Sequence, residues 1–376
     1  MKKRILALLL CVCLALAVFA ACGNDTNSNT PSNPGTSTPE TPSNPGTPDD
    51  GNNNDPEPVK EAVISVKTGA VPGEDLYEMF VNFGNKLEAA SGGAMTIDLY
   101  SSSDYRDAVA LDDVLNNNAD IVYLSSASAS TTVSELAYLG IYGCYNYVNG
   151  YDDTESLLSF YEATKDAVSD IYADYNCHFL SYRVPGYLVI ASADTDVLTP
   201  SDLSGKLMRT SGTWIGQLAD AMGISSQNVK ITEIATALQR KTVDAALSGD
   251  AQCRDLMFYE VSGNISIFPE ADQVGCVVFC QGTWDKLDAA QQACVEQAAY
   301  DAMVDMLAGR AAEYEEMLEL FQQYSDVRII SEEECKVWTS YIPAIFEKID
   351  AEVGPKGPVL KQAILDWRAA NGLKLG

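Results

Sequence analysis

The chain has little histidine, no Cys-x-x-Cys motif and few positive charges. Its 376 residues include one histidine, His178, so the usual donor sets of zinc sites are missing. Lys and Arg number 24 against 53 Asp and Glu, and the formal net charge is −29. A surface of this sign repels phosphate backbones, so we exclude nucleic acid as a partner. We expect no metal and no other cofactor.

Long apolar runs are also absent, apart from residues 5–21. This run follows the basic residues 2–4 and is shorter than the roughly 20 residues of a spanning helix. It ends in small residues before Cys22, which predicts a signal peptide over 1–21 and cleavage before Cys22. Small residues before a cysteine resemble the bacterial lipobox, in which the cysteine then carries lipid, although Phe19 stands where that motif usually has Leu. An ordinary secretory peptide is the alternative.

The segment after Cys22 has no large apolar residue between positions 23 and 58. Eight of the 15 prolines are there, and the heptapeptide T-P-S-N-P-G-T occurs at both 30–36 and 41–47. Such a composition cannot bury enough apolar surface to offset the entropy of ordering. We predict that residues 22–58 are a disordered tether between the lipid and a folded body.

The remaining residues, 59–376, are too many for one small core and suggest two lobes. This body contains seven cysteines, an odd number with wide gaps, which is not typical of a disulfide framework. Cys276 and Cys280 fall on one face of a strand-like run, where two core thiols are more expected than a metal pair. The seven are Cys144, Cys177, Cys253, Cys276, Cys280, Cys294 and Cys335.

Strand-like and helix-like segments alternate along the body, which predicts a parallel α/β arrangement. The predicted strands are 62–68, 95–100, 120–124, 177–182, 187–192, 206–209, 244–247 and 274–280, and the predicted helices are 74–90, 105–115, 153–173, 214–222 and 231–240.

One further helical stretch, residues 287–324, is unusually long. A single helix of this length would span about 57 Å, more than one lobe. Gly309 is the only residue within it that opposes helix formation, at a cost of about 1 kcal/mol. We predict one helix that spans both lobes, with two helices broken near Gly309 as the alternative.

Two sequence motifs carry a resemblance to a known family. Residues 199–209, T-P-S-D-L-S-G-K-L-M-R, are similar to the motif T-P-x-D-L-x-G-x-K-x-R of the solute-binding proteins of TRAP (tripartite ATP-independent periplasmic) transporters. Residues 233–244, E-I-A-T-A-L-Q-R-K-T-V-D, resemble that family's E-x-x-x-A-L-Q-x-G-x-V-D-G. Weaker similarities at 98–103, 118–121, 258–261 and 360–364 extend the resemblance over about residues 62–370.

The resemblance implies an α/β, two-lobed periplasmic-binding-protein-like fold with a long helix spanning both lobes. Lobe I would comprise 59–186 and 275–314, and lobe II 187–274 and 315–376. It also implies a protein that is not an enzyme. Such a protein captures an organic acid outside the cytoplasm, in the cleft between the lobes, and delivers it to the membrane subunits of the permease.

Arg209 is the strongest site residue that the resemblance implies, because the family's arginine at this position holds the ligand's carboxylate. A guanidinium offers a planar fork that matches a carboxylate, and it stays charged when buried. We expect Arg209→Ala to abolish carboxylate binding and to leave thermal unfolding unchanged.

The chain departs from the family at several positions. Ser248 stands where the family often has Asn, and Tyr187-Leu-Val189 stands where a second arginine is expected, so Arg183 cannot simply be taken as its replacement. Ser125 and Ser126 follow a predicted strand and could face the cleft. Tyr187 and Trp214 lie beside these segments, where core packing and cleft lining are both open. These losses favour a monocarboxylate with an apolar or aromatic body.

Three other functions stay open from the sequence. The chain could serve an ATP-driven importer, although the long helix and the Arg209 motif argue against it. A cell-surface glycan hydrolase could use a pair of carboxylates, whereas a serine triad lacks a base because His178 is far from any G-x-S-x-G. A sensor could use the same binding cleft with a signalling partner.

Overall fold

The computed structural model describes residues 58–105, 107–271 and 273–374. All of them belong to one compact unit, Glu57–Gly376. The predicted signal peptide, Cys22 and all of the tether except its last residue lie outside these ranges. Within them, no helix combines the length and the apolar character that a membrane span requires.

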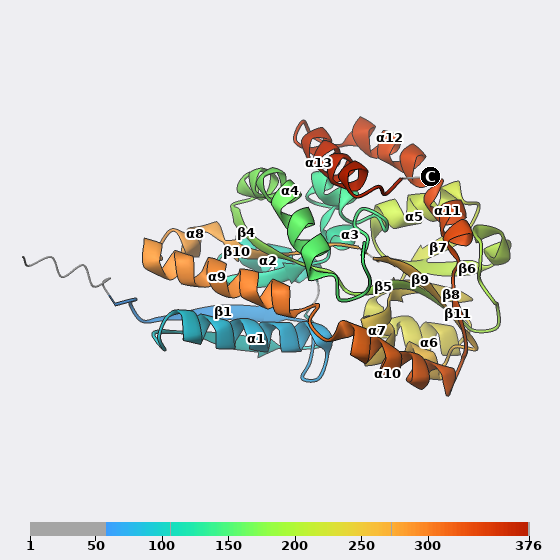
Figure 1. The fold of residues 1–376 in the computed structure, drawn as a ribbon, viewed down its shortest axis with the longest axis horizontal. Helices are drawn as coiled ribbons and strands as arrows, with labels where there is room; N and C mark the ends of the chain where they lie inside the picture. Colours follow the sequence, from blue (N-terminus) through green and yellow to red (C-terminus); the bar gives the residue numbers. More distant parts are fainter. Residues whose placement is uncertain (1–57, 106, 272, 375–376) are drawn as a thin grey trace, which may run out of the picture. The chain divides into compact units, whose positions relative to one another are not determined.

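The first sheet has five strands in the order β2-β1-β3-β10-β4 (Figure 1). Its strands are β1 Ala62–Thr68, β2 Met95–Ser101, β3 Ile121–Leu124, β4 Cys177–Arg183 and β10 Gly275–Cys280.

The second sheet has six strands in the order β11-β9-β5-β8-β6-β7. They are β5 Tyr187–Ser192, β6 Leu207–Thr210, β7 Ser225–Asn228, β8 Ala245–Gly249, β9 Asn264–Ala271 and β11 Asp326–Ile329. The sequence prediction includes neither β7, β9 nor β11.

The predicted parallel pairing is correct for only part of each sheet. β1 is parallel to β2 and β3, and β6 is parallel to β7 and β8. In contrast, β10 is antiparallel to β3 and β4, and β5 is antiparallel to β8 and β9. Both exceptions begin just after the chain changes sheets.

Helices cover the faces of both sheets. They are α1 Asp75–Ala90, α2 Asp107–Leu115, α3 Ser126–Ala129, α4 Thr154–Ala173, α5 Gly212–Ala221, α6 Ile234–Gln239, α7 Asp250–Asp255, α8 Gln281–Trp284, α9 Ala289–Asp305, α10 Arg310–Gln322, α11 Glu332–Thr339, α12 Ile342–Glu352 and α13 Gly357–Ala370. Short 3-10 turns lie at η1 Ser134–Tyr138, η2 Pro200–Leu203, η3 Ile231–Glu233 and η4 Phe258–Glu260.

The predicted single helix over 287–324 is two helices, as in the alternative reading. Asp288 caps the start of α9 by accepting hydrogen bonds from the N–H groups of Ala290 and Gln291. The chain leaves the helix after Asp305 and resumes at Arg310, with Gly309 at φ +84. Glycine adopts this left-handed conformation without the steric cost that other residues meet. α9 packs against α1 and β4, whereas α10 packs against β11 of the second sheet (Figure 1).

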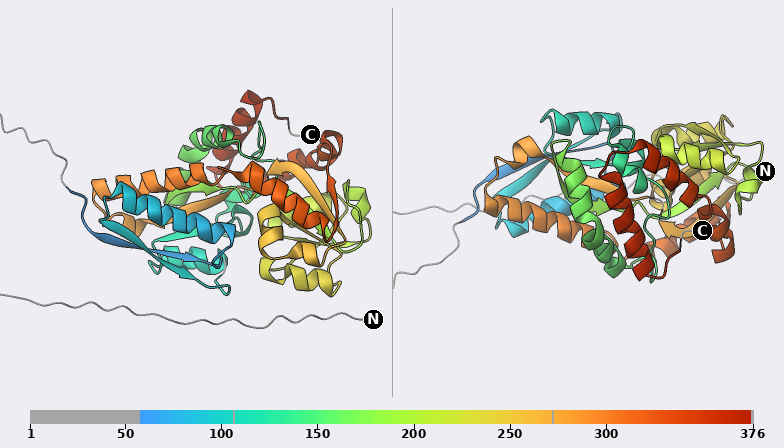
Figure 2. Two further views of the ribbon diagram at one scale, coloured as in Figure 1. Left: turned by 60° about the horizontal axis from the view of Figure 1, so that its bottom comes forward. Right: turned by 90° about the horizontal axis from the view of Figure 1, so that it is seen from above.

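The chain therefore passes between the sheets at three places, which we call the crossovers. They are residues 184–186 between β4 and β5, the connection from β9 to β10, and residues 306–309 between α9 and α10. The C-terminal helix α13 lies along α4 and η1 (Figure 2, right), although the lobe assignment places it in lobe II and these two in lobe I. The lobe boundaries stay a prediction.

Candidate functional site

Arg209 lies near the carboxyl end of β6, just before the chain turns into α5. Its Nε donates to the carbonyl oxygen of Val229 at 2.9 Å, and its Nη1 donates to the carbonyl oxygen of Leu247 at 2.7 Å. The residue is 5% exposed. Truncation would leave the buried Leu247 carbonyl without its donor, at about 1–3 kcal/mol, and would also remove the part-buried bond to Val229. The expectation that Arg209→Ala leaves unfolding unchanged is therefore revised.

Ser248 lies on the neighbouring strand β8, next to the Leu247 carbonyl that Arg209 holds. Its hydroxyl donates to Gln252 Oε1 at 2.9 Å, and the side chain is buried. Strand pairing places Arg209 opposite Ala246. Arg209 and Ser248 therefore share one end of the second sheet, where ligands of α/β proteins bind.

Ser125 and Ser126 follow β3 of the first sheet, and both are buried. The Ser125 hydroxyl donates to Gln273 Oε1 at 3.0 Å, and Ser126 Oγ lies 3.8 Å from Cys276 Sγ. The next residue, Ala127, meets the start of α5, since a Cβ atom on Gly212 would lie 2.1 Å from the Ala127 carbonyl oxygen. The Ser125 region thus contacts the loop that follows Arg209.

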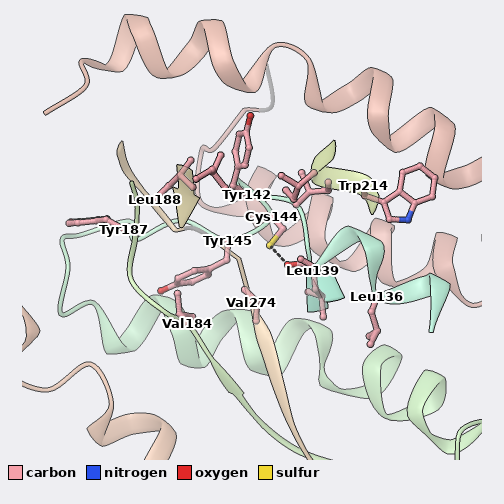
Figure 3. Packing of buried hydrophobic residues seen from close by; sticks show 14 of the residues in the cluster. Leu136, Leu139, Tyr142, Cys144, Tyr145, Val184, Tyr187, Leu188, Trp214 and Val274 are labelled. Atoms are coloured by element: carbon pink, nitrogen blue, oxygen red, sulfur yellow. Dashed lines mark hydrogen bonds between the residues drawn. The ribbon is translucent and has the colours of Figure 1, made fainter. Parts of the chain in front are cut away.

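Tyr187 and Trp214 do not share one pocket wall. Figure 3 draws them at opposite sides of the same buried group, with Tyr145 and Cys144 between them. Both side chains are buried, at 9% and 6% exposure. Trp214 is on α5 near Ala127, whereas Tyr187 begins β5 at the first crossover.

Tyr187 belongs to a group of four tyrosines that we call the tyrosine cluster. Its ring stacks on Tyr151 with centroids 4.1 Å apart, and the rings of Tyr147 and Tyr314 meet it edge-on. Tyr314 comes from α10, Tyr187 from β5, and the other two from the loop before α4. The tyrosine cluster therefore packs segments of both sheets together beside the crossovers.

Asp250, the first residue of α7, lies against the tyrosine cluster and is fully buried. Both of its carboxylate oxygens lie within 2.8 Å of the Tyr151 hydroxyl, and the Ala251 N–H donates to Oδ1 at 2.6 Å. Burial raises the pKa of Asp250 to about 6, against the lowering effect of the Tyr151 hydrogen bond. Gly186 is required here, because a Cβ at its φ of +130 would lie 1.8 Å from Asp250 Oδ1.

Arg183 and Arg310 converge on one carboxylate, and we call Asp75, Arg183 and Arg310 the crossover cluster. Asp75 Oδ2 lies 2.6 Å from Arg183 Nη2 and 3.3 Å from Arg310 Nη2. Burial opposes ionisation of Asp75, but the two guanidinium groups lower its pKa overall. The Asp75 N–H in turn donates to Asp255 Oδ2 at 2.9 Å. The charge of Arg183 is therefore compensated within the chain.

Asp75, Tyr151, Asp250 and Arg310 are site residues that the sequence prediction omits. Asp75 is 108 positions from Arg183 and 235 from Arg310, and no local pattern joins them. The one local signal was Gly309, because a helix break there places Arg310 at a new helix start.

Two hollows differ in size and place. One of about 10 Å³, room for about one water, lies between Asp75, Tyr151, Arg310 and Tyr314. A larger open groove of about 580 Å³ lies between α4 and α13. None of the predicted site residues lines the larger groove, so we place the candidate site at the sheet ends and the crossovers.

Two sheets of mixed strand pairing, covered by helices and joined by short crossovers, are the two-lobed arrangement of periplasmic binding proteins that the resemblance implies. The sequence matches the model of the DctP family, bacterial extracellular solute-binding protein family 7, over residues 68–352. The chain belongs to this family, whose members are the solute-binding proteins of TRAP transporters.

Solved structures agree with this fold. The ectoine-binding protein of the TeaABC TRAP transporter of Halomonas elongata is similar with TM-score 0.72 and 18% identity, over 82% of this chain and 100% of that one. DctP6 of Bordetella pertussis, a receptor binding pyroglutamic acid, gives 0.71 and 17%, over 81% and 100%. A protein of Sulfurospirillum deleyianum with bound succinate gives 0.69 and 18%, over 81% and 98%. Comparison with the curated proteins gave no match.

Proposed function

We propose that this protein captures an organic acid between its two sheets and delivers it to the membrane subunits of a TRAP permease, without catalysing a reaction. Arg209 binds the carboxylate, and Ser248 lies beside it as a second polar contact. The observation that carries the proposal is the family's arginine motif, whose Arg209 is fixed by two carbonyls at the end of β6.

The energy of one such contact is modest. Hydrogen bonds to a charged group contribute about 1.5–3 kcal/mol net, while micromolar affinity needs about 8 kcal/mol. Arg209 therefore selects the ligand class and its orientation, and the approach of the two sheets supplies the remainder. Gly212, three residues after Arg209, contacts Ala127, which follows the first sheet.

The ligand that this site favours is a monocarboxylate with an apolar or aromatic body. Arg183, a candidate second anchor, already shares Asp75 with Arg310, so the proposal gives the ligand one carboxylate and one anchor, Arg209. Trp214, on the helix that follows Arg209, supplies aromatic surface, and Ser125 and Ser126 supply hydroxyl groups from the first sheet, whereas Tyr187 lies apart in the tyrosine cluster.

The membrane association belongs to the same proposal. A lipid on Cys22 would hold the protein at the outer face of the cell membrane, and residues 22–58 would give the body reach toward the permease. Labelling with a fatty-acid probe tests this step, because Cys22→Ser should lose the label and release the protein.

A thermal-shift screen of the 59–376 body tests the function. The acids are pyroglutamate, succinate, L-malate, galactonate and a set of aromatic monocarboxylates. A ligand at a hundredfold excess over its Kd stabilises by about 2.7 kcal/mol, which shifts the midpoint measurably. No shift with any acid would contradict the proposal.

Two simple observations would distinguish the proposed TRAP function from an ATP-driven importer and from a glycan hydrolase. Neighbouring genes for membrane subunits of four and twelve helices would support the TRAP assignment over an ATP-driven importer. Turnover of any member of a glycan panel would instead show a hydrolase.

A further inference from the structure

Two of the seven body cysteines occupy facing positions in the first sheet. Cys177 is the first residue of β4 and Cys280 is the last residue of β10. The antiparallel pairing of these strands places the two residues directly opposite each other. Both thiols are free in the structure and both are buried.

Main-chain hydrogen bonds show which kind of pair this is. The Cys280 N–H points away from β4, because it donates to the carbonyl oxygen of Asp120 at 2.7 Å. The neighbouring Gln281 N–H donates to the carbonyl oxygen of Asn176 at 3.0 Å. Cys177 and Cys280 therefore occupy a non-hydrogen-bonded pair of the antiparallel ladder, in which the two residues exchange no main-chain hydrogen bonds. Such pairs have Cα atoms about 4.5 Å apart, within the range of roughly 4.4–6.8 Å that disulfides span.

The two side chains also point to the same face of the sheet. Residues directly opposite each other share a face. Cys177 and Cys280 both belong to the larger buried cluster, whereas the adjacent Phe279 belongs to the smaller one on the other face. Burial, and to a lesser degree the Cys280 thiol, raises the pKa of Cys177 to about 12, which agrees with their proximity.

The hydrogen bonds that the two thiols donate in the structure are weak. The Cys177 thiol donates to the Tyr175 carbonyl oxygen at 3.3 Å, and the Cys280 thiol donates to Asn117 Oδ1 at 2.9 Å. An S–H group is a weak donor, so rotation of both side chains toward each other sacrifices little.

We propose that Cys177 and Cys280 form a structural disulfide that joins β4 to β10. The two thiols are oxidised by an external disulfide through a mixed disulfide. One protein disulfide forms, the external S–S bond breaks, and its two sulfur atoms leave as thiols with the two electrons and two protons. Buried thiols react slowly because oxidants reach them poorly, so the bond forms while the chain folds.

The compartment agrees with this chemistry. The family is extracellular, and disulfides persist in extracellular proteins. The bond would close a loop of about 100 residues, for which the loss of unfolded-state entropy is large. This inference is independent of the proposed ligand.

Peptide mapping of the full-length chain tests it. The chain is unfolded in reductant, refolded with oxidised glutathione, alkylated and digested with trypsin without reduction. Cleavage after Lys165, Arg183, Arg254 and Lys286 gives the peptides 166–183 and 255–286, which contain Cys177 and Cys280. We expect these two peptides to be linked, and the link to disappear on reduction.

Cys276 supplies a matched control, since it lies on the same strand and in the same peptide as Cys280. Cys276→Ser should keep the link and Cys280→Ser should lose it. The oxidised wild type should unfold at least about 5 °C above the reduced form.

Three results would overturn the inference. They are fully alkylated Cys177 and Cys280 in refolded protein with native circular dichroism, a link that uses Cys276 instead, or equal unfolding midpoints of the oxidised and reduced forms. If Cys280→Ser fails to fold, the wild-type peptide map decides alone.

Discussion

The end of β6 and the crossover cluster both hold buried arginine, but they hold it in different ways. Two main-chain carbonyl oxygens accept hydrogen bonds from Arg209, whereas the Asp75 carboxylate accepts from both Arg183 and Arg310. Hydrogen bonds to main-chain carbonyls orient one guanidinium group within its sheet, while a shared carboxylate joins two guanidinium groups from different elements. The comparison teaches that burial alone does not separate the arginine that we propose as the ligand anchor from the two that share a carboxylate.

The largest effect that would test this comparison is the loss of Asp75. Asp75→Asn leaves two buried guanidinium groups beside a neutral side chain, and removing one partner of a buried pair costs about 3–5 kcal/mol. Urea unfolding of the purified body measures it. Asp194→Asn is the control, because its ion pairs with Lys206 and Lys241 are exposed and should contribute less than about 1 kcal/mol. Equal losses in the two variants would show that the crossover cluster is not a buried ion network.

A smaller effect comes from the contact between the Arg209 loop and the first sheet. Gly212 and Gly205 have nearly the same left-handed φ, +71 and +72, but a Cβ atom on Gly212 would meet the Ala127 carbonyl and one on Gly205 would meet nothing within 4 Å. Gly205→Ala should cost about 1 kcal/mol, from the backbone conformation alone. Gly212→Ala should cost about 2 kcal/mol more and should also weaken acid binding. If Gly212→Ala binds the acid with unchanged affinity, the contact between Gly212 and Ala127 plays no part in ligand binding.

The smallest expected effect is a dependence of stability on pH. Burial raises the pKa of Glu270 to about 7, against the lowering effects of Arg368 and Asn146, and burial raises that of Asp250 to about 6. A carboxyl group with a raised pKa binds its proton more tightly in the folded chain than in the unfolded chain. Proton binding therefore stabilises the fold fully at a pH below the pKa of the unfolded state, and this stabilisation is lost as the pH rises through about 6–7. The free energy of unfolding should fall by about 1–2 kcal/mol between pH 6 and pH 7.

Glu270→Gln is the matched variant for this dependence, because it removes one of the two groups and leaves the rest of the surface charge in place. Its slope over the same interval should be shallower than that of the wild type. An identical slope would mean that Glu270 has an ordinary pKa in the folded protein.

Much of the fold could be predicted from the sequence, since apolar alternation and turn residues are local signals. β1 and β5 begin and end where predicted, and both are rich in β-branched residues. β7 has the sequence Ser-Ser-Gln-Asn and is an edge strand, so it lacks the apolar pattern on which strand prediction depends. The break at Gly309 was only the alternative prediction, because one glycine is compatible with a helix when only its local cost is considered.

The candidate site could be predicted only where a family motif marks it. Arg209 and Ser248 could be named as candidates because Arg209 stands at a fixed position of one family motif and Ser248 follows the other. The crossover cluster was not found, because its three residues come from α1, β4 and α10 and meet only when both sheets are folded. The motif also gave no sign that Arg209 is fixed by Val229 and Leu247, which is why the expected stability of Arg209→Ala had to be revised.

The most direct test of the account is calorimetry of wild type and Arg209→Lys with the acid that gives the largest thermal shift. Lysine keeps the charge but loses the planar fork, so we predict an affinity at least about tenfold weaker, a loss of about 1.4 kcal/mol. Arg183→Lys, a variant in the crossover cluster, should bind the acid within about threefold of wild type. Full affinity in Arg209→Lys together with lost affinity in Arg183→Lys would contradict the assignment of Arg209 as the carboxylate anchor.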